Sequence, residues 1–514
     1  NDHRVFSNYG EILRGCGKLK EAEALIRKAI GINPNLFNYH LNLSKVMIKQ
    51  DKQKEAQVPL LRAIELKPDL AEAHLNLGSI FKGFGKFKEA EISTRKAIKI
   101  KPDFAEAYSN LGNIMIDFNN IKEAERLQRK AIELKPNFSE AHFNLGNILK
   151  TLGKFKEAEL SHRKAIKIKP DFAKAHCNLG NTLLELGKVK EAELSLRKAI
   201  ELNPDLPNFY LNLGIIFDEM GELNEALKAY QIALKKEPNN PNIIAKLIDI
   251  SSKLSLWIDT EKYLRFLSKI DINLQCFNPF NLLNIEDDPI LHLRRATNYN
   301  KKNFNRTSSK IKLTKKEKIH IGYLSADFHI HPVMFLICRI LELHDHSKFK
   351  IFIYTLNKRE DDYTRKLKKY PFNFRSIYGK SDLESVMIAK NDELDIAIDL
   401  MGYTKKNRMN IFSYRIAPIQ INYLGYPGTS GSSEIDYIIG DKFLIPDHYR
   451  EYYSERVLYM PHCFMPFDNK TLISKKNFKK VDFGLPEESF ILAAFHKNEK
   501  ITAREISSWS NILK

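Results

Sequence analysis

Cysteine, tryptophan and long apolar runs are all scarce in this sequence of 514 residues. There are two tryptophans and five cysteines, and no two cysteines form a CxxC pair. The cysteines are Cys16, Cys177, Cys276, Cys338 and Cys463. Scattered cysteines argue against a disulfide framework or a zinc site and favour reduced thiols in a cytoplasmic protein. No stretch of about 18 apolar residues occurs, so we expect no transmembrane helix.

Acidic residues are fewer than basic ones. The sequence has 82 Lys and Arg and 63 Asp and Glu, which gives a net charge of +19. A basic balance is compatible with nucleic-acid or membrane partners. The lysines, however, are spread along the chain together with many asparagines and isoleucines. The densest basic run, residues 301–318, lies between two predicted domains and is interpreted as a linker. We therefore predict neither a nucleic-acid nor a membrane partner.

A pattern of 34 residues recurs from residue 3 to residue 240 and gives seven repeats without a gap. Alanine occupies the twentieth and twenty-seventh positions of every repeat, where a small residue lets two helices approach closely. A proline closes each repeat, from Pro34 to Pro238, and interrupts the helix. The pattern resembles the tetratricopeptide repeat, a helix-turn-helix unit that buries its apolar face only by stacking into a superhelix.

The sixth position of each repeat holds asparagine in all seven cases. These residues are Asn8, Asn42, Asn76, Asn110, Asn144, Asn178 and Asn212. An amide side chain on the concave face offers a donor and an acceptor to the backbone of an extended peptide. We predict that this set, called here the asparagine ladder, binds peptide backbones; the alternative is that it only bridges neighbouring helices.

Beyond residue 316 the period changes to alternating strands and helices, which predicts an α/β Rossmann-like lobe. Buried strands are predicted near residues 319–325, 349–356, 395–400 and 418–424. Loops that follow the carboxyl ends of parallel strands are where such folds bind their ligands.

Several segments of this lobe carry a family resemblance. They are residues 322–332 (GYLSADFHIHP), 399–404 (DLMGYT), 415–420 (RIAPIQ), 424–431 (LGYPGTSG) and 459–464 (YMPHCF). Together with the upstream repeats they resemble the O-linked N-acetylglucosamine transferases and their plant SPINDLY-type relatives. The resemblance implies a two-lobed, B-type glycosyltransferase that inverts the anomeric carbon while moving N-acetylglucosamine from UDP-GlcNAc to Ser or Thr of proteins. It implies no metal and no cofactor.

The resemblance also assigns candidate site residues. His331 matches the histidine beside the acceptor and the sugar, and Lys500 matches a lysine that would neutralise the departing diphosphate. His329 is interpreted as a loop histidine, because two histidines alone are too few for a metal site. The matching cleft and donor positions are Tyr403, Thr404, Gly428, Thr429, Gly431 and Lys497, with ordinary turn residues as the alternative for the loop positions. Relatives carry an amide residue at the position of Lys497 and, in some cases, a histidine at that of Asp395.

These observations predict four regions. They are seven repeats (3–240), a degenerate repeat with a helical connector and basic linker (241–316), a first catalytic lobe (317–475) and an incomplete second lobe (476–514). Both ends look cut, so we expect this piece alone to be inactive. Two alternatives stay open: a protein-interaction scaffold with a disabled transferase half, or the same enzyme class using another donor such as GDP-fucose.

Overall fold

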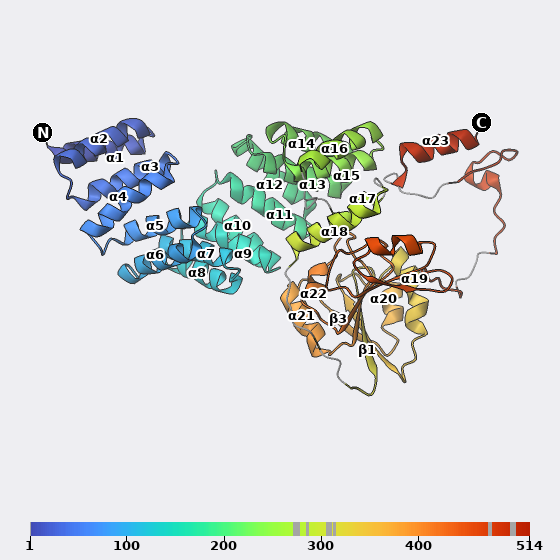
Figure 1. The fold of residues 1–514 in the computed structure, drawn as a ribbon. Helices are drawn as coiled ribbons and strands as arrows, with labels where there is room; N and C mark the ends of the chain where they lie inside the picture. Colours follow the sequence, from blue (N-terminus) through green and yellow to red (C-terminus); the bar gives the residue numbers. More distant parts are fainter. Residues whose placement is uncertain are drawn as a thin grey trace. The chain divides into compact units, whose positions relative to one another are not determined.

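The computed structural model describes residues 2–270, 278–283, 287–304, 311, 315–470, 475–493 and 500–513. Figure 1 shows its helices and strands in chain order. Contacts within the chain divide it into two compact units, Asn1–Asp205 and Leu206–Lys514. None of the helices in the described ranges combines the length and the apolar character needed to cross a membrane.

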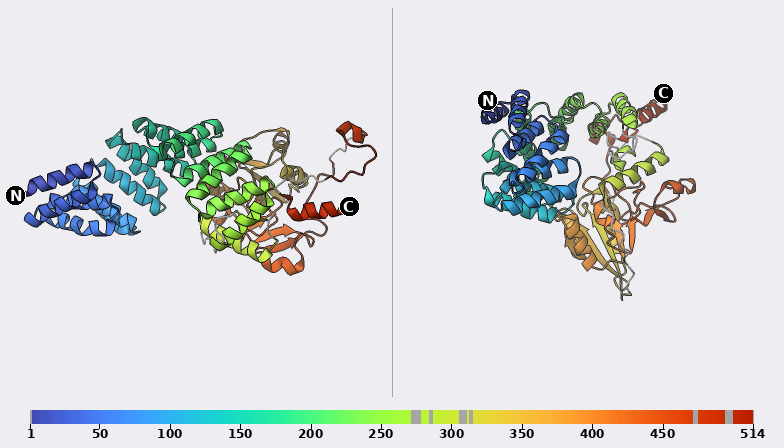
Figure 2. Two further views of the ribbon diagram at one scale, coloured as in Figure 1. Left: turned by 90° about the horizontal axis from the view of Figure 1, so that it is seen from above. Right: turned by 60° about the vertical axis from the view of Figure 1, so that its left-hand side comes forward.

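Helices α1 to α14 form consecutive pairs, one pair for each predicted repeat (Figure 2). The first helices of the pairs are α1 (His3–Gly15), α3 (Phe37–Lys49), α5 (Ala71–Gly83), α7 (Ala105–Asp117), α9 (Ser139–Thr151), α11 (Ala173–Glu185) and α13 (Pro207–Met220). The second helices are α2 (Leu19–Ile32), α4 (Gln53–Leu66), α6 (Phe87–Ile100), α8 (Ile121–Leu134), α10 (Phe155–Ile168), α12 (Val189–Leu202) and α14 (Leu223–Lys236).

Small residues bring the two helices of each pair together. Every alanine at the twentieth and twenty-seventh positions is fully buried, as Ala158 and Ala165 in the fifth repeat illustrate. The eighth position is glycine in six of the repeats, and its missing Cβ leaves room for a side chain of the second helix. A Cβ on Gly146 would lie 2.5 Å from the ring of His162. Close packing of this kind, repeated along the array, replaces a single central core.

The pairing of helices continues past residue 240. Helices α15 (Pro241–Lys253) and α16 (Trp257–Ile270) pack against each other, and α15 contacts α14. An ion pair of 2.8 Å joins Lys253 to Asp218 of α13. The connector then forms α17 (Pro279–Leu282) and α18 (Pro289–Asn303). The array of helix pairs therefore continues past residue 240, where the repeat pattern is degenerate in the sequence.

The lobe that follows contains one parallel sheet with strand order β3-β2-β1-β4-β5-β6-β7. Its strands are β1 (Ile319–Ser325), β2 (Phe349–Thr355), β3 (Asn373–Ser376), β4 (Ile396–Asp399), β5 (Ile419–Asn422), β6 (Tyr437–Gly440) and β7 (Arg456–Tyr459). Its helices are α19 (Pro332–Glu342), α20 (Asp362–Leu367), α21 (Asp382–Asn391), α22 (Met409–Ser413) and the 3-10 helix η1 (Asp447–Tyr452). After β7 come the 3-10 helix η2 (Lys480–Phe483) and α23 (Ala503–Ile512).

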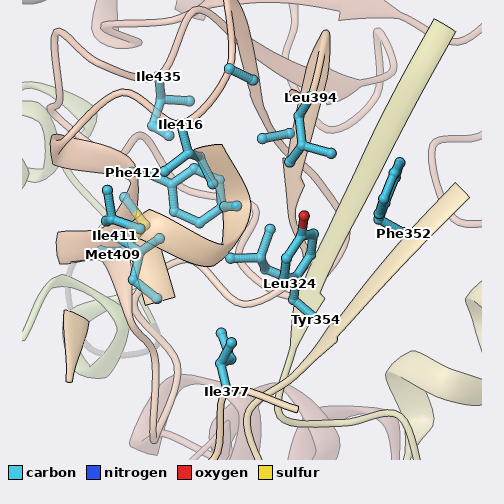
Figure 3. Close-up of a cluster of buried hydrophobic side chains, with 14 of the residues drawn as sticks. Leu324, Phe352, Tyr354, Ile377, Leu394, Met409, Ile411, Phe412, Ile416 and Ile435 are labelled. Atoms are coloured by element: carbon cyan, nitrogen blue, oxygen red, sulfur yellow. The ribbon is translucent and has the colours of Figure 1, made fainter. Parts of the chain in front are cut away.

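Alternate residues of the central strands face opposite sides of the sheet, and each side has its own core. Leu324, Phe352 and Tyr354 face α21 and α22, in the cluster that Figure 3 shows. Tyr323 and Ile353 face α19 and α20. A parallel sheet covered on both faces is the expected architecture for strands that read as continuous apolar runs. The predicted order, helical repeats followed by a Rossmann-like lobe, is confirmed.

Candidate active site and docking surface

The sheet has its topological switch point between β1 and β4. From β1 the chain runs outward to β2 and β3, whereas β4 begins the run to β7 on the other side. Loops that follow two such strands diverge and leave a crevice at their carboxyl ends. The two loops meet at its base, where the Ala326 amide donates to the Met401 sulfur at 3.1 Å. The side of the switch point at the carboxyl ends of β1 and β4, called here the crevice, is the candidate active site.

His331 ends the loop after β1 and caps α19. Its backbone is extended (φ −158°, ψ 148°), and its Nδ1 accepts a hydrogen bond from the Val333 amide at 3.3 Å. Pro332 takes the first helical position, where its missing N–H costs nothing. Because Nδ1 accepts, a neutral ring carries its proton on Nε2, which is then a donor. The side chain is 39% exposed, so it is held in place and is also accessible.

Two polar side chains flank this cap. An oxygen of Asp327 lies 3.6 Å from Nδ1 of His331. The ring of His329 lies 5.8 Å from that of His331, and burial lowers the pKa of His329. Its Nδ1 lies 3.3 Å from the amide nitrogen of Asn357. His329 is thus part of the packed loop, in agreement with its interpretation as a loop histidine.

Asp399 ends β4 and shapes the second loop of the crevice. Its two carboxylate oxygens accept the amides of Met401 and Gly402, each at 2.9 Å. The side chain is almost fully buried, and this burial raises its pKa to about 6. Gly402 has φ +54°, and a Cβ there would lie 2.3 Å from Tyr426. The sequence motif contained Asp399, but no role was predicted for it.

Tyr403 lies inside the lobe beneath the crevice. It is fully buried, its hydroxyl donates to the Ser430 carbonyl, and its own carbonyl accepts from Asn278 at 3.0 Å. Its ring packs edge-on against Tyr299 of α18. Tyr403 therefore supports the loop from within. Thr404, the next residue, is half-buried, and its carbonyl accepts the side-chain amide of Asn407 at 2.8 Å.

The loop after β5 holds the remaining predicted cleft residues and is fixed by a buried carboxylate. Glu455 accepts the Thr429 hydroxyl at 2.8 Å and the Ser430 amide at 2.7 Å. Gly428 packs on Tyr426, whose hydroxyl would lie 2.6 Å from an added Cβ. At Gly431 (φ +61°) an added Cβ would lie 2.2 Å from a backbone atom of α18. The close approach at Gly431 is thus to the connector helix, which favours the alternative of a structural glycine.

The structure does not bring every predicted residue together. Lys500 is exposed, and no contact joins it to the described residues of the sheet lobe. Lys497 lies outside the described residues. Asp395 stands before β4, at the end of the sheet opposite His331, and accepts the His320 amide at 2.8 Å. It therefore caps a strand end. No described group of three or more His, Cys, Asp and Glu side chains is arranged to hold a metal ion.

The asparagine ladder is partly exposed and linked from repeat to repeat. Asn8 is exposed and the other six are half-buried. Four of them donate to a side chain of the preceding repeat. These pairs are Asn42 with Ser7 (3.4 Å), Asn110 with Ser79 (2.7 Å), Asn144 with Ser109 (3.3 Å) and Asn178 with Asn147 (2.6 Å). Each bond uses one N–H and fixes the amide, so bridging and peptide binding are compatible at these positions.

Glu455 and the α18 contact of Gly431 were missed by reasoning from the sequence. Glu455 precedes a short strand and carries no motif of its own, and its partners lie 25 and 26 residues away. The only available signal was the TSG segment, whose polar backbone needs a fixed acceptor once it is buried.

The fold combines helical repeats with a Rossmann-like lobe, and the candidate site lies at the switch point of its sheet. Residues 287–482 match glycosyl transferase family 41. Tetratricopeptide repeat families match residues 3–36, 71–104, 104–135, 127–159, 146–187, 173–206 and 207–240. Residues 287–482 are thus similar to glycosyl transferase family 41, and they follow a segment similar to tetratricopeptide repeats.

Relatives with similar sequences carry names of one activity. One is a probable UDP-N-acetylglucosamine–peptide N-acetylglucosaminyltransferase, SEC of Arabidopsis thaliana, with 34% identity over 204 residues. Another is the UDP-N-acetylglucosamine–peptide N-acetylglucosaminyltransferase of Caenorhabditis elegans, with 31% identity over 204 residues. Each match covers 38% of this chain, but only 21% of the plant protein and 16% of the nematode protein.

Among solved structures, a mutant O-GlcNAc transferase of Thermobaculum terrenum matches with a TM-score of 0.45 and 21% identity. That match covers 73% of this chain and 66% of the bacterial one.

Proposed function

We propose that the protein transfers N-acetylglucosamine from UDP-GlcNAc to Ser or Thr hydroxyls of proteins that dock on its repeats. The family 41 match over residues 287–482 carries this proposal, because it includes the crevice and its capping histidine. The acceptor oxygen bonds to the anomeric carbon, the bond from that carbon to the diphosphate breaks, and UDP leaves. The hydroxyl proton passes to water, so the products are the glycosylated protein, UDP and one proton.

His331 contributes to this step as an oriented hydrogen-bond donor. With Nδ1 engaged by the Val333 amide, the Nε2–H of a neutral ring remains to donate to a ligand at the switch point. A donor fixed in advance stabilises negative charge that develops in the transition state. The amino end of α19 adds a favourable dipole for an anionic diphosphate at the same place. Lys500 is proposed to neutralise the leaving diphosphate, and Lys497 to lie beside it.

The repeats are proposed to deliver the protein acceptor. Tetratricopeptide repeats are protein-binding units, and the asparagine ladder presents an amide in every repeat with an oxygen and a second N–H available to a peptide. Such contacts would bind the backbone of an acceptor largely independently of its sequence. No cofactor or metal is needed for the proposed step.

The direct test is product analysis with two donors. The full-length protein is incubated with a mixture of cytoplasmic proteins and either UDP-GlcNAc or GDP-fucose, and modified peptides are identified by mass spectrometry. We expect N-acetylhexosamine on Ser and Thr with UDP-GlcNAc alone. Transfer from GDP-fucose alone would overturn the donor assignment, and no transfer from either would favour the scaffold alternative.

A further inference from the structure

On the ladder side of the array, the twelfth position of one repeat lies beside the thirteenth position of the next. Two junctions close this gap with an ion pair. Lys82 of the third repeat pairs with Asp117 of the fourth at 3.2 Å. Asp218 of the seventh repeat pairs with Lys253 of the following helix pair at 2.8 Å. Opposite charges at these two positions therefore meet when nothing else occupies them.

The junction of the fifth and sixth repeats departs from this rule. The same two positions hold Lys150 and Glu185, again of opposite charge. Neither side chain forms an ion pair with the other or with any other described residue, although ion pairs elsewhere in the array are frequent. A cavity of about 390 Å³ lies there instead, and both residues line it.

The rest of the cavity wall includes Asn178 of the asparagine ladder and the residue that it contacts, Asn147. Asn178 donates to Asn147 at 2.6 Å, and both residues line the cavity together with Thr151 and the ring of Phe155. Glu185 is the last residue of α11, where a negative charge meets the negative end of the helix dipole. An ion pair offsets this cost for Asp117 at the end of α7, but none does so for Glu185. Both charges that line the cavity, Lys150 and Glu185, therefore lack an ion-pair partner among the described residues.

We propose that this cavity is a subsite for an extended segment of a docked protein that carries one acidic and one basic side chain. The acidic side chain pairs with Lys150 and the basic one with Glu185, while the ladder residue Asn178 and its partner Asn147 hold the backbone between them. The proposal rests on the proposed docking function and adds a charge preference to it.

The spacing suits a short peptide. In an extended chain two side chains placed three residues apart span about 10 Å, so that each charge of the peptide can pair with a different residue of the cavity wall. A ligand with only one charge would leave the other protein charge unpaired. The expected ligand is therefore a peptide of mixed charge and defined order.

Peptide binding without donor sugar tests this directly. Two labelled peptides place an aspartate and a lysine three residues apart in opposite orders, and a third has neutral residues there. Fluorescence anisotropy with the full-length protein should show that one order binds better than the neutral peptide, by about fivefold for each ion pair formed. Equal affinity for all three peptides would overturn the proposal.

A charge swap provides the sharper experiment. The double variant Lys150→Glu with Glu185→Lys keeps the net charge and should reverse the preferred order. The matched control is Lys82→Glu with Asp117→Lys, which exchanges two residues that already form an ion pair with each other. It should leave the preferred order of charges in the peptide unchanged. A swap at 150 and 185 that keeps the wild-type order would contradict the subsite. Failure of every peptide to bind would contradict the docking function as well, whereas charge-blind binding contradicts the subsite alone.

A second measurement, independent of any ligand, covers the case in which peptide binding is weak. Double-mutant cycles on urea unfolding should detect coupling between Lys82 and Asp117 and none between Lys150 and Glu185 in the free protein. Coupling of equal size at both junctions would show that Lys150 and Glu185 pair with each other, and would overturn the proposal.

Discussion

The repeat array and the sheet lobe place their functional residues by different means. In the array similar contacts recur at several repeat junctions, and bonds such as that from Asn144 to Ser109 join residues about one repeat apart. In the lobe each contact is made once and joins distant segments. Asn278 and Tyr403, for example, are 125 residues apart in the chain. The array therefore contains internal copies against which any position can be compared, and the lobe does not.

The largest effect is expected where a lobe contact is unique. His331→Ala removes both the oriented Nε2–H and the helix cap, and transfer should fall by at least about 100-fold. His331→Asn keeps a capping side chain and serves as the control. If the asparagine variant is as inactive as the alanine variant in a radiolabelled-sugar assay, the ring acts in the chemistry. Activity close to wild type in His331→Asn would reduce the histidine to a cap.

Gly431 tests whether the connector helix is part of the lobe. Gly431→Ala forces a Cβ onto the backbone of α18 and should destabilise the lobe by about 3 kcal/mol or more. Gly379 also has positive φ (+71°) but no neighbour within 4 Å, so Gly379→Ala should cost only about 1 kcal/mol. Chemical unfolding followed by circular dichroism would compare them. Equal losses would mean that the α18 contact contributes nothing.

His162 offers the matching test in the array. It is fully buried, and neither ring nitrogen has a hydrogen-bond partner among the described residues, whereas the sixth repeat uses Leu196 at the same position. Burial lowers its pKa to about 4, so the unfolded chain binds the proton more readily. Wild-type stability should fall as the pH drops from about 6.5 to about 4, by up to about 1.4 kcal/mol per pH unit.

His162→Leu should stabilise the array at pH 7 by about 1–2 kcal/mol and should remove that pH dependence. The reciprocal variant Leu196→His should introduce the same dependence in the sixth repeat. Thermal unfolding at pH 5 and pH 7 measures both. A His162→Leu protein with an unchanged difference between the two pH values would show that a partner stabilises the ring.

Asp399 should change stability with pH in the opposite direction to His162. Burial raises its pKa to about 6, so its contribution to stability is present below about pH 4 and is lost as the pH rises through 6. The stability difference between wild type and Asp399→Asn should therefore shift in favour of the asparagine variant over this range. Unfolding curves at pH 4.5 and pH 7 would measure the shift, and a pH-independent difference would contradict the raised pKa.

The sequence predicted more of the repeat array than of the loops in the sheet lobe. The buried alanines and the asparagine ladder could be predicted because all seven repeats carry the same residue at these positions. The apolar strands of the lobe predicted its parallel sheet. The sequence did not predict that Glu455 accepts a hydrogen bond from Thr429 or that Gly431 packs on α18. They depend on side chains and backbone that meet only after the loops, the sheet and the connector have come together.

The proposed function requires the repeats and the sheet lobe to act together, with the asparagine ladder binding protein acceptors and His331 contributing to transfer. The decisive measurement is kcat/KM for a protein acceptor and for a short peptide acceptor, in His331→Ala and in a variant with Asn76, Asn110, Asn144 and Asn178 all changed to Ala. The account predicts that His331→Ala lowers both values equally. It predicts that the ladder variant lowers only the value for the protein acceptor, by about tenfold or more. Equal losses for both acceptors in the ladder variant would contradict it.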